Sequence, residues 1–155
     1  MNGGPSPVAG IVLAAGMSTR FGANKLLAPF DGKPLIKIVV EAALASRLAR
    51  LFVVLGHQAD RVRAALGGLA GEVEILINPA FAEGQSSTVK TGLDAAAKDF
   101  AAAMFLMGDQ PLLDAQIIDG LIEAFQASDK DICYPAHQGR RRNPVIFGKH
   151  FFPHI

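Results

Sequence analysis

Short apolar runs alternate with helical patterns along most of this chain, and this alternation restricts the possible fold more than any other feature. Runs typical of buried strands span residues 8–14, 51–55, 73–77 and 103–107, and helical patterns span residues 34–46, 60–66, 88–98 and 114–127. Strands that alternate with helices form a mostly parallel sheet with helices on both faces. The sequence therefore predicts an α/β fold of three layers, resembling a Rossmann fold.

The C-terminal part follows a different pattern. Residues 131–135 and 144–147 are extended pieces on either side of the basic turn HQGRRR, which predicts an extension that resembles a β-hairpin. The chain has 155 residues, half of them hydrophobic, so it can bury one substantial core. We therefore expect a single domain over residues 1–155.

Composition excludes several classes of protein. Lys and Arg number 15 against 14 Asp and Glu, so the net charge of +1 gives no general attraction to nucleic acid or to an anionic membrane. Cys133, the only cysteine, rules out an internal disulfide and is expected to be a small buried hydrophobe in a reducing compartment. The N-terminal residues lack the pattern of a secretory signal, and no apolar stretch is long enough to span a bilayer. We expect a cytoplasmic protein with neither a nucleic-acid nor a membrane partner.

The segment LAAGMSTRFGANKLL follows the first apolar run, at the sheet edge where α/β proteins bind ligands. Gly16 and Gly22 allow backbone N–H groups to approach phosphate oxygens, Ser18 adds a hydroxyl, and Arg20 and Lys25 add positive charge. The segment matches neither GxxxxGK[ST] nor GxGxxG. Taken alone, it is as typical of a solvated turn as of a nucleotide site.

Asp109 follows the strand-like run 103–107 within GDQP. A carboxylate at a strand's end suits Mg²⁺, which takes one or two protein carboxylates and fills its other positions with water and substrate phosphates. An aspartate that caps the next turn is the alternative interpretation. Because Asp109 falls at the same predicted edge as Arg20 and Lys25, we favour the metal ligand.

The segment GQSSTVKTGL predicts a helix start that carries hydroxyl groups. A helix N-terminus attracts phosphate, and Ser86 or Ser87 is available as its N-cap, although an ordinary capped helix fits equally well. Gly92 falls inside this helix, where glycine costs about 1 kcal/mol relative to alanine. Close packing against a neighbouring strand or ligand loop would explain it.

The segment GRRRNP places three guanidinium groups in one turn. Such a turn is usually only solvated, but a second anionic group that enters beside a metal would need a partner of this kind. His150 and His154 do not complete a zinc motif, and no serine lies in a GxSxG elbow, so metalloprotease and serine-hydrolase chemistry are not expected.

Together, LAAGMSTRFGANKLL, GQSSTVKTGL, GDQPLL and GRRRNPVIFG resemble the molybdenum cofactor nucleotidyltransferases, in particular their cytidylyltransferase branch, within the sugar-nucleotide transferase-like superfamily. The resemblance covers nearly the whole chain. It implies a nucleotidyltransferase fold, Mg²⁺ as cofactor, and transfer of CMP from CTP to the phosphate of molybdopterin with release of pyrophosphate. Handover of the product to molybdenum hydroxylases is a further implication.

The resemblance also implies roles for particular residues. Lys25, Arg20 and Asp109 would be catalytic, with Asp109 as the metal ligand. The nucleotide site would comprise Leu13, Ala14, Ala15, Gly16, Ser18, Arg20, Gly22, Lys25, Asn78, Gly84, Ser86, Ser87 and Asp109. Ala15 stands where the GTP-using branch has glycine and so implies CTP. The second substrate would contact Gln110, Arg141 and Asn143.

Two departures from the family pattern leave alternatives open. Arg142 stands where many relatives have glycine, and relatives continue into a further aspartate segment, so we expect the C-terminal portion of the domain to be absent. One alternative is a nucleotidyltransferase that acts on a sugar or polyol phosphate. Another is a non-catalytic chaperone that binds a nucleotide or molybdenum cofactor.

Overall fold

The structure is a computed structural model that describes residues 4–17 and 22–155. Its centre is a six-stranded sheet in the order β5-β4-β1-β6-β10-β7. The first four strands in this order are mutually parallel, whereas β10 runs antiparallel to both of its neighbours. The strands are β1 (Ala9–Ala14), β4 (Arg50–Leu55), β5 (Glu74–Ile77), β6 (Ala102–Met107), β7 (Ile132–Cys133) and β10 (Val145–Gly148). The predicted α/β fold with a mostly parallel sheet is confirmed.

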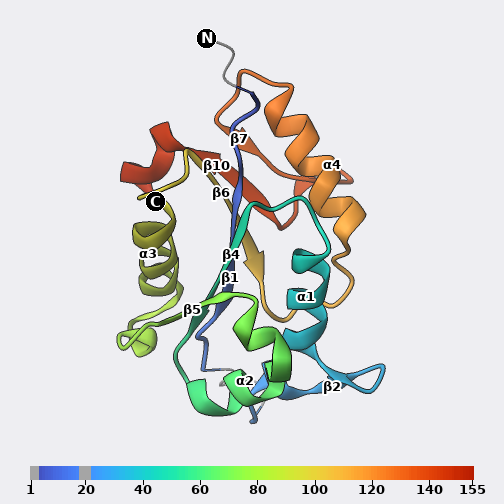
Figure 1. Cartoon of the computed structure of the whole chain (residues 1–155), viewed down its shortest axis with the longest axis vertical. Helices are drawn as coiled ribbons and strands as arrows, with labels where there is room; N and C mark the ends of the chain where they lie inside the picture. The colour runs from blue at the N-terminus through green and yellow to red at the C-terminus, as the bar shows by residue number, and fades with distance from the viewer. Residues whose placement is uncertain (1–3, 18–21) are drawn as a thin grey trace.

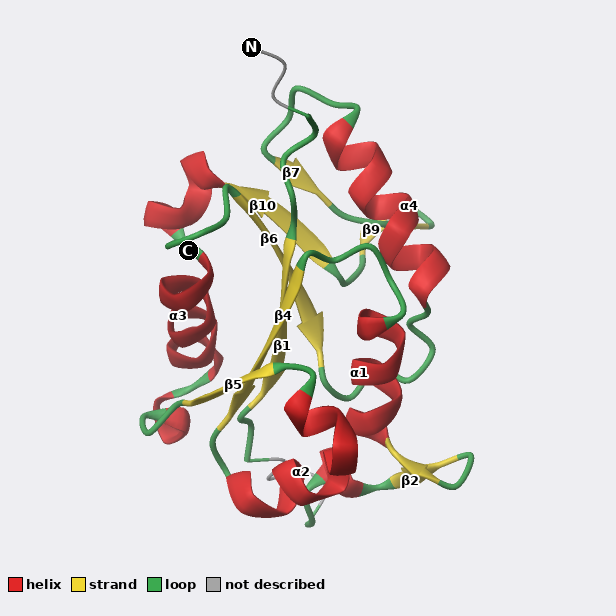
Figure 2. Ribbon diagram, in the orientation of Figure 1, coloured by secondary structure: helices red, strands yellow, loops and turns green. Residues whose placement is uncertain are grey.

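Helices cover both faces of this sheet (Figures 1 and 2). On one face lie α1 (Leu35–Leu44), α2 (Ala59–Leu66) and α4 (Ala115–Gln126), and on the other lies α3 (Gln85–Ala96). Short 3-10 helices are η1 (Lys25–Leu27), η2 (Gly67–Gly71), η3 (Phe81–Glu83) and η4 (Lys149–His154). The three layers follow from strands that are apolar on both sides.

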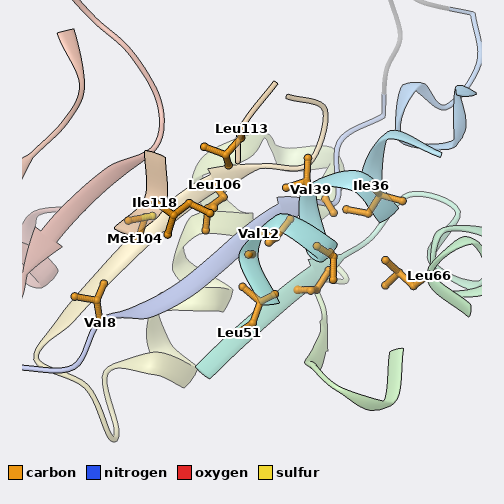
Figure 3. Packing of buried hydrophobic residues seen from close by; sticks show 14 of the residues in the cluster. Val8, Val12, Ile36, Val39, Leu51, Leu66, Met104, Leu106, Leu113 and Ile118 are labelled. Carbon is orange, nitrogen blue, oxygen red and sulfur yellow. The ribbon is translucent and has the colours of Figure 1, made fainter. Parts of the chain in front are cut away.

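Strand β1 divides its side chains between two hydrophobic cores. Val12 faces α1, α2 and α4, whereas Ile11 and Leu13 face α3. Figure 3 shows the first core, in which Val12, Val39 and Leu106 lie among side chains from strands and helices. Every residue of β1 is buried, because the strand has a packed layer on each face. The central strand is therefore held rigidly at the point where the site begins.

Most observed elements agree closely with their predicted ranges, but the helix after GQSS does not. The prediction began this helix at Thr88, whereas α3 begins at Gln85. Gly84 is its N-cap with φ 113°, and no side chain caps the helix, so the prediction of a serine N-cap is wrong. A backbone in this region of φ favours glycine, which allows the chain to enter the helix a turn earlier.

The extension near the C-terminus forms, but it does more than make a hairpin. Strands β7 and β10 complete one edge of the main sheet, and β8 (Ala136–His137) and β9 (Arg140–Arg141) form a separate hairpin. A second hairpin, of β2 (Pro29–Phe30) and β3 (Lys33–Pro34), was not predicted. Its turn, Asp31-Gly32, has positive φ at both residues, as Asp-Gly hairpin turns require. No helix in the described ranges is long and apolar enough to cross a membrane.

The register of the parallel strands brings three loops together. Leu13 of β1 pairs with Met107 of β6, and Ala14 pairs with Leu55 of β4. The chain leaves these strands at neighbouring points, so the loops that begin at Ala15, Gly56 and Gly108 meet at one edge. This is the edge at which open α/β sheets bind ligands.

Candidate active site

A cavity of about 350 Å³ lies at this edge, between the end of the sheet and the start of α3. The loop after β1, helix η1, the segment around η3, the first turns of α3 and the end of β6 all contribute to it. Its lining comprises Leu13, Ala14, Ala15, Gly16, Met17, Lys25, Leu26, Phe81, Ala82, Gly84, Gln85, Thr88, Met107 and Asp109. We call it the first cavity.

The loop after β1 supplies one wall of the first cavity. Ala15 is buried, while Gly16 is exposed on the wall. Gly22 has φ 69° but is not among the lining residues, so its predicted phosphate contact stays a prediction. Ser18 and Arg20 lie outside the described residues, and their predicted roles also stay predictions.

Asn24 fixes the start of η1, the helix that carries Lys25. Its buried side chain accepts a hydrogen bond from the Leu26 N–H at 3.1 Å. Leu26 is buried beneath the loop and anchors the same turn. The local structure therefore directs Lys25 to the cavity wall.

Lys25 and Asp109 meet on that wall. The Lys25 Nζ lies 3.3 Å from Asp109 Oδ2, and the two side chains are 46% and 34% exposed. Both groups therefore remain accessible to a ligand. An ion pair this exposed contributes at most about 1 kcal/mol to folding, so separating its two charges costs little. The structure thus brings together two of the three predicted catalytic residues.

Gly108 allows the close approach that places Asp109. A Cβ at Gly108 would lie 3.1 Å from the carbonyl oxygen of Leu13 and 3.0 Å from Leu26. The Gly108 N–H donates to the same carbonyl at 3.1 Å, which ties the end of β6 to β1. A larger residue before Asp109 would push this loop away from the cavity.

A second cavity of about 370 Å³ adjoins the first, and Asp109 lines both. Pro111, Leu112, Leu113 and Ile117 form an apolar side. Polar groups on the wall come from Gln110, Arg142 and Asn143. The predicted contacts of Gln110 and Asn143 with a second substrate stay predictions. The basic turn near the C-terminus therefore reaches the loop after β6.

Arg141 is not among the residues that line the second cavity. Its guanidinium group lies over the Tyr134 ring, 5.0 Å from the ring centroid, which is a cation–π contact. Its neighbour Arg142 occupies the cavity wall instead. The structure therefore places Arg142 on this wall, and the predicted contact of Arg141 with the second substrate stays a prediction.

The start of α3 supplies the opposite wall of the first cavity. Gly84, Gln85 and Thr88 line it, and Gln85 Nε2 lies 3.6 Å from the Met107 sulfur. Ser86 is exposed but is not a lining residue, and Ser87 directs its hydroxyl toward the backbone carbonyls of Ala80 and Gly84. Contacts from the two serines to a nucleotide stay predictions.

Asn78 is buried and does not line the cavity either. Its amide donates to the hydroxyls of Ser87 at 2.9 Å and Thr88 at 3.0 Å, and it accepts from the Ala80 N–H at 2.9 Å. These contacts give Asn78 a role in holding the first turn of α3. Its predicted contact with the base, ribose or pterin stays untested.

Glycines let α3 and the loop after β4 pack closely behind the cavity. A Cβ at Gly92 would collide with Ile11 and lie 3.1 Å from Val54, which confirms the prediction of close packing against a strand. A Cβ at Gly56 would lie 2.9 Å from the Ala15 methyl and 2.6 Å from Phe81. The Ala15 methyl therefore lies close to the Gly56 backbone.

The donor set fits a hard divalent cation held mainly by its substrate. Asp109 offers a partly exposed carboxylate on the wall of both cavities. In the ranges that the structure describes, no group of three or more His, Cys, Asp or Glu residues could form a complete cage. One carboxylate supplemented by water and phosphate oxygens is a usual arrangement for Mg²⁺.

Several cavity residues were missed from the sequence. Phe81, Met107 and Thr88 line the first cavity, and Arg142 lines the second. No short motif marks Phe81, since it lies in the isolated turn η3. Thr88 carried a usable signal, because a helix start places its third and fourth residues near the same end as its N-cap.

Comparison with known proteins matches residues 10–155 to the MobA-like NTP transferase domain. The chain belongs to this family. A relative in Thermococcus sibiricus, named a probable molybdenum cofactor guanylyltransferase, is 31% identical over 137 residues, or 88% of this chain and 65% of that protein. The bifunctional protein GlmU of Synechococcus sp. is 33% identical over 142 residues, or 90% of this chain. The chain spans only 31% of the length of that GlmU protein.

Solved structures confirm the nucleotidyltransferase fold of this family member. Rv0371c of Mycobacterium tuberculosis superposes with a TM-score of 0.84 at 22% identity, covering 97% of this chain and 76% of that one. The same protein in complex with manganese superposes with a TM-score of 0.78 at 20% identity, covering 96% of this chain and 74% of that one. CMP:2-keto-3-deoxy-manno-octonic acid synthetase complexed with CTP superposes with a TM-score of 0.72 at 15% identity, covering 96% of this chain and 76% of that one.

Proposed function

We propose that this MobA-like domain transfers CMP from CTP to the terminal phosphate of molybdopterin and releases pyrophosphate. The observation that carries the proposal is the placement of Asp109, which lines two adjoining cavities and faces Lys25 at 3.3 Å. A reaction that joins two anionic substrates needs two neighbouring sites and a shared group at their junction. Asp109 meets that requirement.

In the proposed reaction, an oxygen of the molybdopterin phosphate attacks the α-phosphorus of CTP. The new P–O bond forms as the bond from the α-phosphorus to the bridging oxygen of pyrophosphate breaks, and no covalent enzyme intermediate is needed. The attacking phosphate is already anionic at neutral pH. The protein therefore has to overcome repulsion between two polyanions and hold them in line.

Lys25 and the start of α3 would hold the triphosphate. Lys25 lies on the wall of the first cavity opposite α3, where its ammonium group neutralises charge on the departing pyrophosphate. The backbone N–H groups at Gln85 and the adjoining turn point out of the helix start, which favours anions. We assign Arg20 a supporting role by resemblance alone.

Asp109 would hold Mg²⁺. A cation held there would supply positive charge that offsets the negative charge of the phosphates and would make the α-phosphorus more electrophilic. The fit of the exposed carboxylate supports this assignment, and the manganese complex of the mycobacterial relative supports a divalent cation at this fold. The choice of magnesium over manganese is part of the proposal.

Ala15 supports CTP as the nucleotide. Ala15 lines the first cavity, and its buried methyl packs near Gly56, so this residue shapes the wall against which a base would lie. A pyrimidine is smaller than a purine, and the resemblance associates alanine here with CTP. The CTP complex of a protein with the same fold is consistent with this choice.

The second cavity supports a pterin-type acceptor over a sugar phosphate. Leu112 is 80% exposed and forms an apolar side with Ile117 and Pro111, while Arg142 offers a cation for a phosphate. A flat, partly apolar ring system can bury against this side, whereas a sugar would leave its hydroxyls facing it without partners. Handover of the product to a molybdenum hydroxylase belongs to the same proposal.

The test offers the purified protein molybdopterin with CTP, GTP, ATP or UTP and measures pyrophosphate release. We expect release with molybdopterin and CTP in the presence of Mg²⁺, and little with the other nucleotides. Hexose 1-phosphates and polyol phosphates serve as competing acceptors. Pyrophosphate release with one of these, but not with molybdopterin, would replace the acceptor in the proposal. Tight CTP binding without any release would instead favour a cofactor chaperone.

A further inference from the structure

The buried amide of Asn78 has a single orientation that satisfies its surroundings. The Ala80 backbone N–H lies 2.9 Å from the side chain and can only donate, so the atom that faces it is Oδ1. The amide nitrogen therefore faces the hydroxyls of Ser87 and Thr88, at 2.9 Å and 3.0 Å. Because an amide nitrogen has no free lone pair, both hydroxyl oxygens must accept from it.

This orientation fixes the role of the Thr88 hydroxyl. Its oxygen accepts from Asn78, and its single proton remains to be donated elsewhere. Ser87 donates its own proton to a backbone carbonyl, but no acceptor for Thr88 lies within hydrogen-bonding distance among the described residues. Thr88 is only 4% exposed, and it lines the first cavity.

A buried donor without an acceptor costs about 1–3 kcal/mol, and a ligand in the cavity can supply the missing partner. The neighbouring wall is formed by Phe81, Ala15 and Met107, which are apolar. The charged pair of Lys25 and Asp109 also lines this cavity. Among these walls, Thr88 adds a neutral, directional donor suited to a heterocyclic base.

We propose that Thr88 donates a hydrogen bond to an acceptor atom of the nucleotide base, and that Asn78 is the positioning residue that forces Thr88 to act as a donor. A cytosine base offers O2 and N3 as acceptors of this bond. The inference rests on the proposed function, because it places the nucleotide in the first cavity. To that function the inference adds Thr88 as a residue that recognises the base, and it explains why the Thr88 hydroxyl acts as a donor.

The experiment measures CTP affinity by isothermal titration calorimetry for the wild type, Thr88→Val and Thr88→Ser. Valine removes the hydroxyl with little change in volume, and we expect the Kd for CTP to rise about tenfold, as the loss of one neutral hydrogen bond predicts. Serine keeps the hydroxyl and should stay within about twofold of the wild type. Inorganic tripolyphosphate, which has no base, should bind all three proteins equally.

Thr91→Val is the matched control on the same helix. The Thr91 hydroxyl donates to the Ser87 carbonyl at 2.9 Å, one turn further on, and it does not line the cavity. This variant should therefore keep the wild-type Kd for CTP. Equal losses in the two valine variants would mean that hydroxyls in α3 act only through folding, which would overturn the inference.

Asn78→Asp provides a second variant that keeps hydrogen bonds to the Ala80 N–H and to Thr88, although Ser87 loses the donor that Asn78 supplies. A carboxylate still accepts from the Ala80 N–H, but it also accepts from Thr88 and so turns that hydroxyl away from the role of donor to the cavity. We expect a loss of CTP affinity similar to that of Thr88→Val, and no further loss when both changes are combined. Additive losses would contradict the positioning role of Asn78.

The outcomes separate the inference from the function beneath it. If the wild type binds CTP and Thr88→Val binds it equally well, the inference is wrong and the proposed function stands. If the wild type binds tripolyphosphate but no nucleotide, the proposed function is wrong and the inference falls with it.

Discussion

The ammonium group of Lys25 lies 3.3 Å from the carboxylate of Asp109, although one comes from a loop after β1 and the other from the end of β6. Among the described residues that line the first cavity, these two carry the charged side chains. In the proposed reaction each takes a new partner, phosphate for Lys25 and a divalent cation for Asp109. The pair therefore holds the two groups ready at one place.

Replacing Lys25 with methionine should lower kcat/KM for pyrophosphate release by about 10²–10³-fold, because a positioned charge on developing negative charge has effects of this size. Lys33→Met is the matched control, since Lys33 of β3 also pairs with a carboxylate, that of Glu41 in α1 at 2.9 Å, and neither residue lines a cavity. Steady-state kinetics check both variants. Wild-type turnover in Lys25→Met would contradict the assignment.

The two arginines of the basic turn should differ in their effects. Arg142→Ala should raise KM for the acceptor about tenfold with little change in KM for CTP, because Arg142 lines the second cavity. Arg141→Ala should leave both constants nearly unchanged, since its guanidinium lies over Tyr134. Kinetics with each substrate varied in turn check this, and the reverse ranking would restore Arg141 as the acceptor residue.

Ala15→Gly should relax the choice of base. Removing a buried methyl from the first cavity enlarges it, and one methyl group in a binding pocket is worth about 10-fold or more in discrimination. We expect the ratio of kcat/KM for GTP to that for CTP to rise by at least that factor. An unchanged ratio would mean that residues other than Ala15 select the base.

Replacing each of two helical glycines with alanine should change the free energy of unfolding in opposite directions. Gly92→Ala in α3 should lower the free energy of unfolding by about 1–3 kcal/mol, because the new methyl collides with Ile11. Gly120→Ala in α4 should raise it by about 0.5–1 kcal/mol, since nothing lies within 4 Å of the added Cβ. Urea denaturation measures both. A stabilised Gly92→Ala variant would show that α3 packs less closely than described.

Cys133 should react slowly with thiol reagents in the native protein. Burial raises the pKa of the Cys133 thiol, so less of the reactive thiolate is present near neutral pH. The rate of labelling by a disulfide reagent at pH 7.5 should rise on unfolding in urea. A native rate equal to the unfolded rate would contradict the partial burial of this residue in β7.

The fold was largely predictable because its signals are local. Alternating strands and helices fix a parallel sheet, and the position of Asp109 after β6 follows from the strand it terminates. The start of α3 was missed because it depends on the backbone conformation of Gly84, with φ 113°, which cannot be deduced from the residue types around it. The hairpin of β2 and β3 was missed because each strand is only two residues long.

The site was predictable only in part, because cavities join residues that no motif connects. Lys25 and Asp109 were predicted to lie at the same edge of the sheet, and they do, but their ion pair was not predicted. The position of Arg142 on the wall of the second cavity could not be foreseen, because it depends on the stacking of the Arg141 guanidinium on Tyr134. Phe81 and Thr88 reach the cavity through the packing of η3 and α3.

The sharing of Asp109 between two cavities has a consequence for how such a protein can diversify. The first cavity is built on the ends of central strands and on α3, whose side chains also support the cores of the sheet. Much of the second cavity is built from the loop after β6 and the turn beside Arg142, and of these lining residues Leu113 also belongs to a hydrophobic core. In the proposed reaction, substitutions at Leu112, Ile117 or Arg142 would therefore change the choice of acceptor and leave the nucleotide site unaltered.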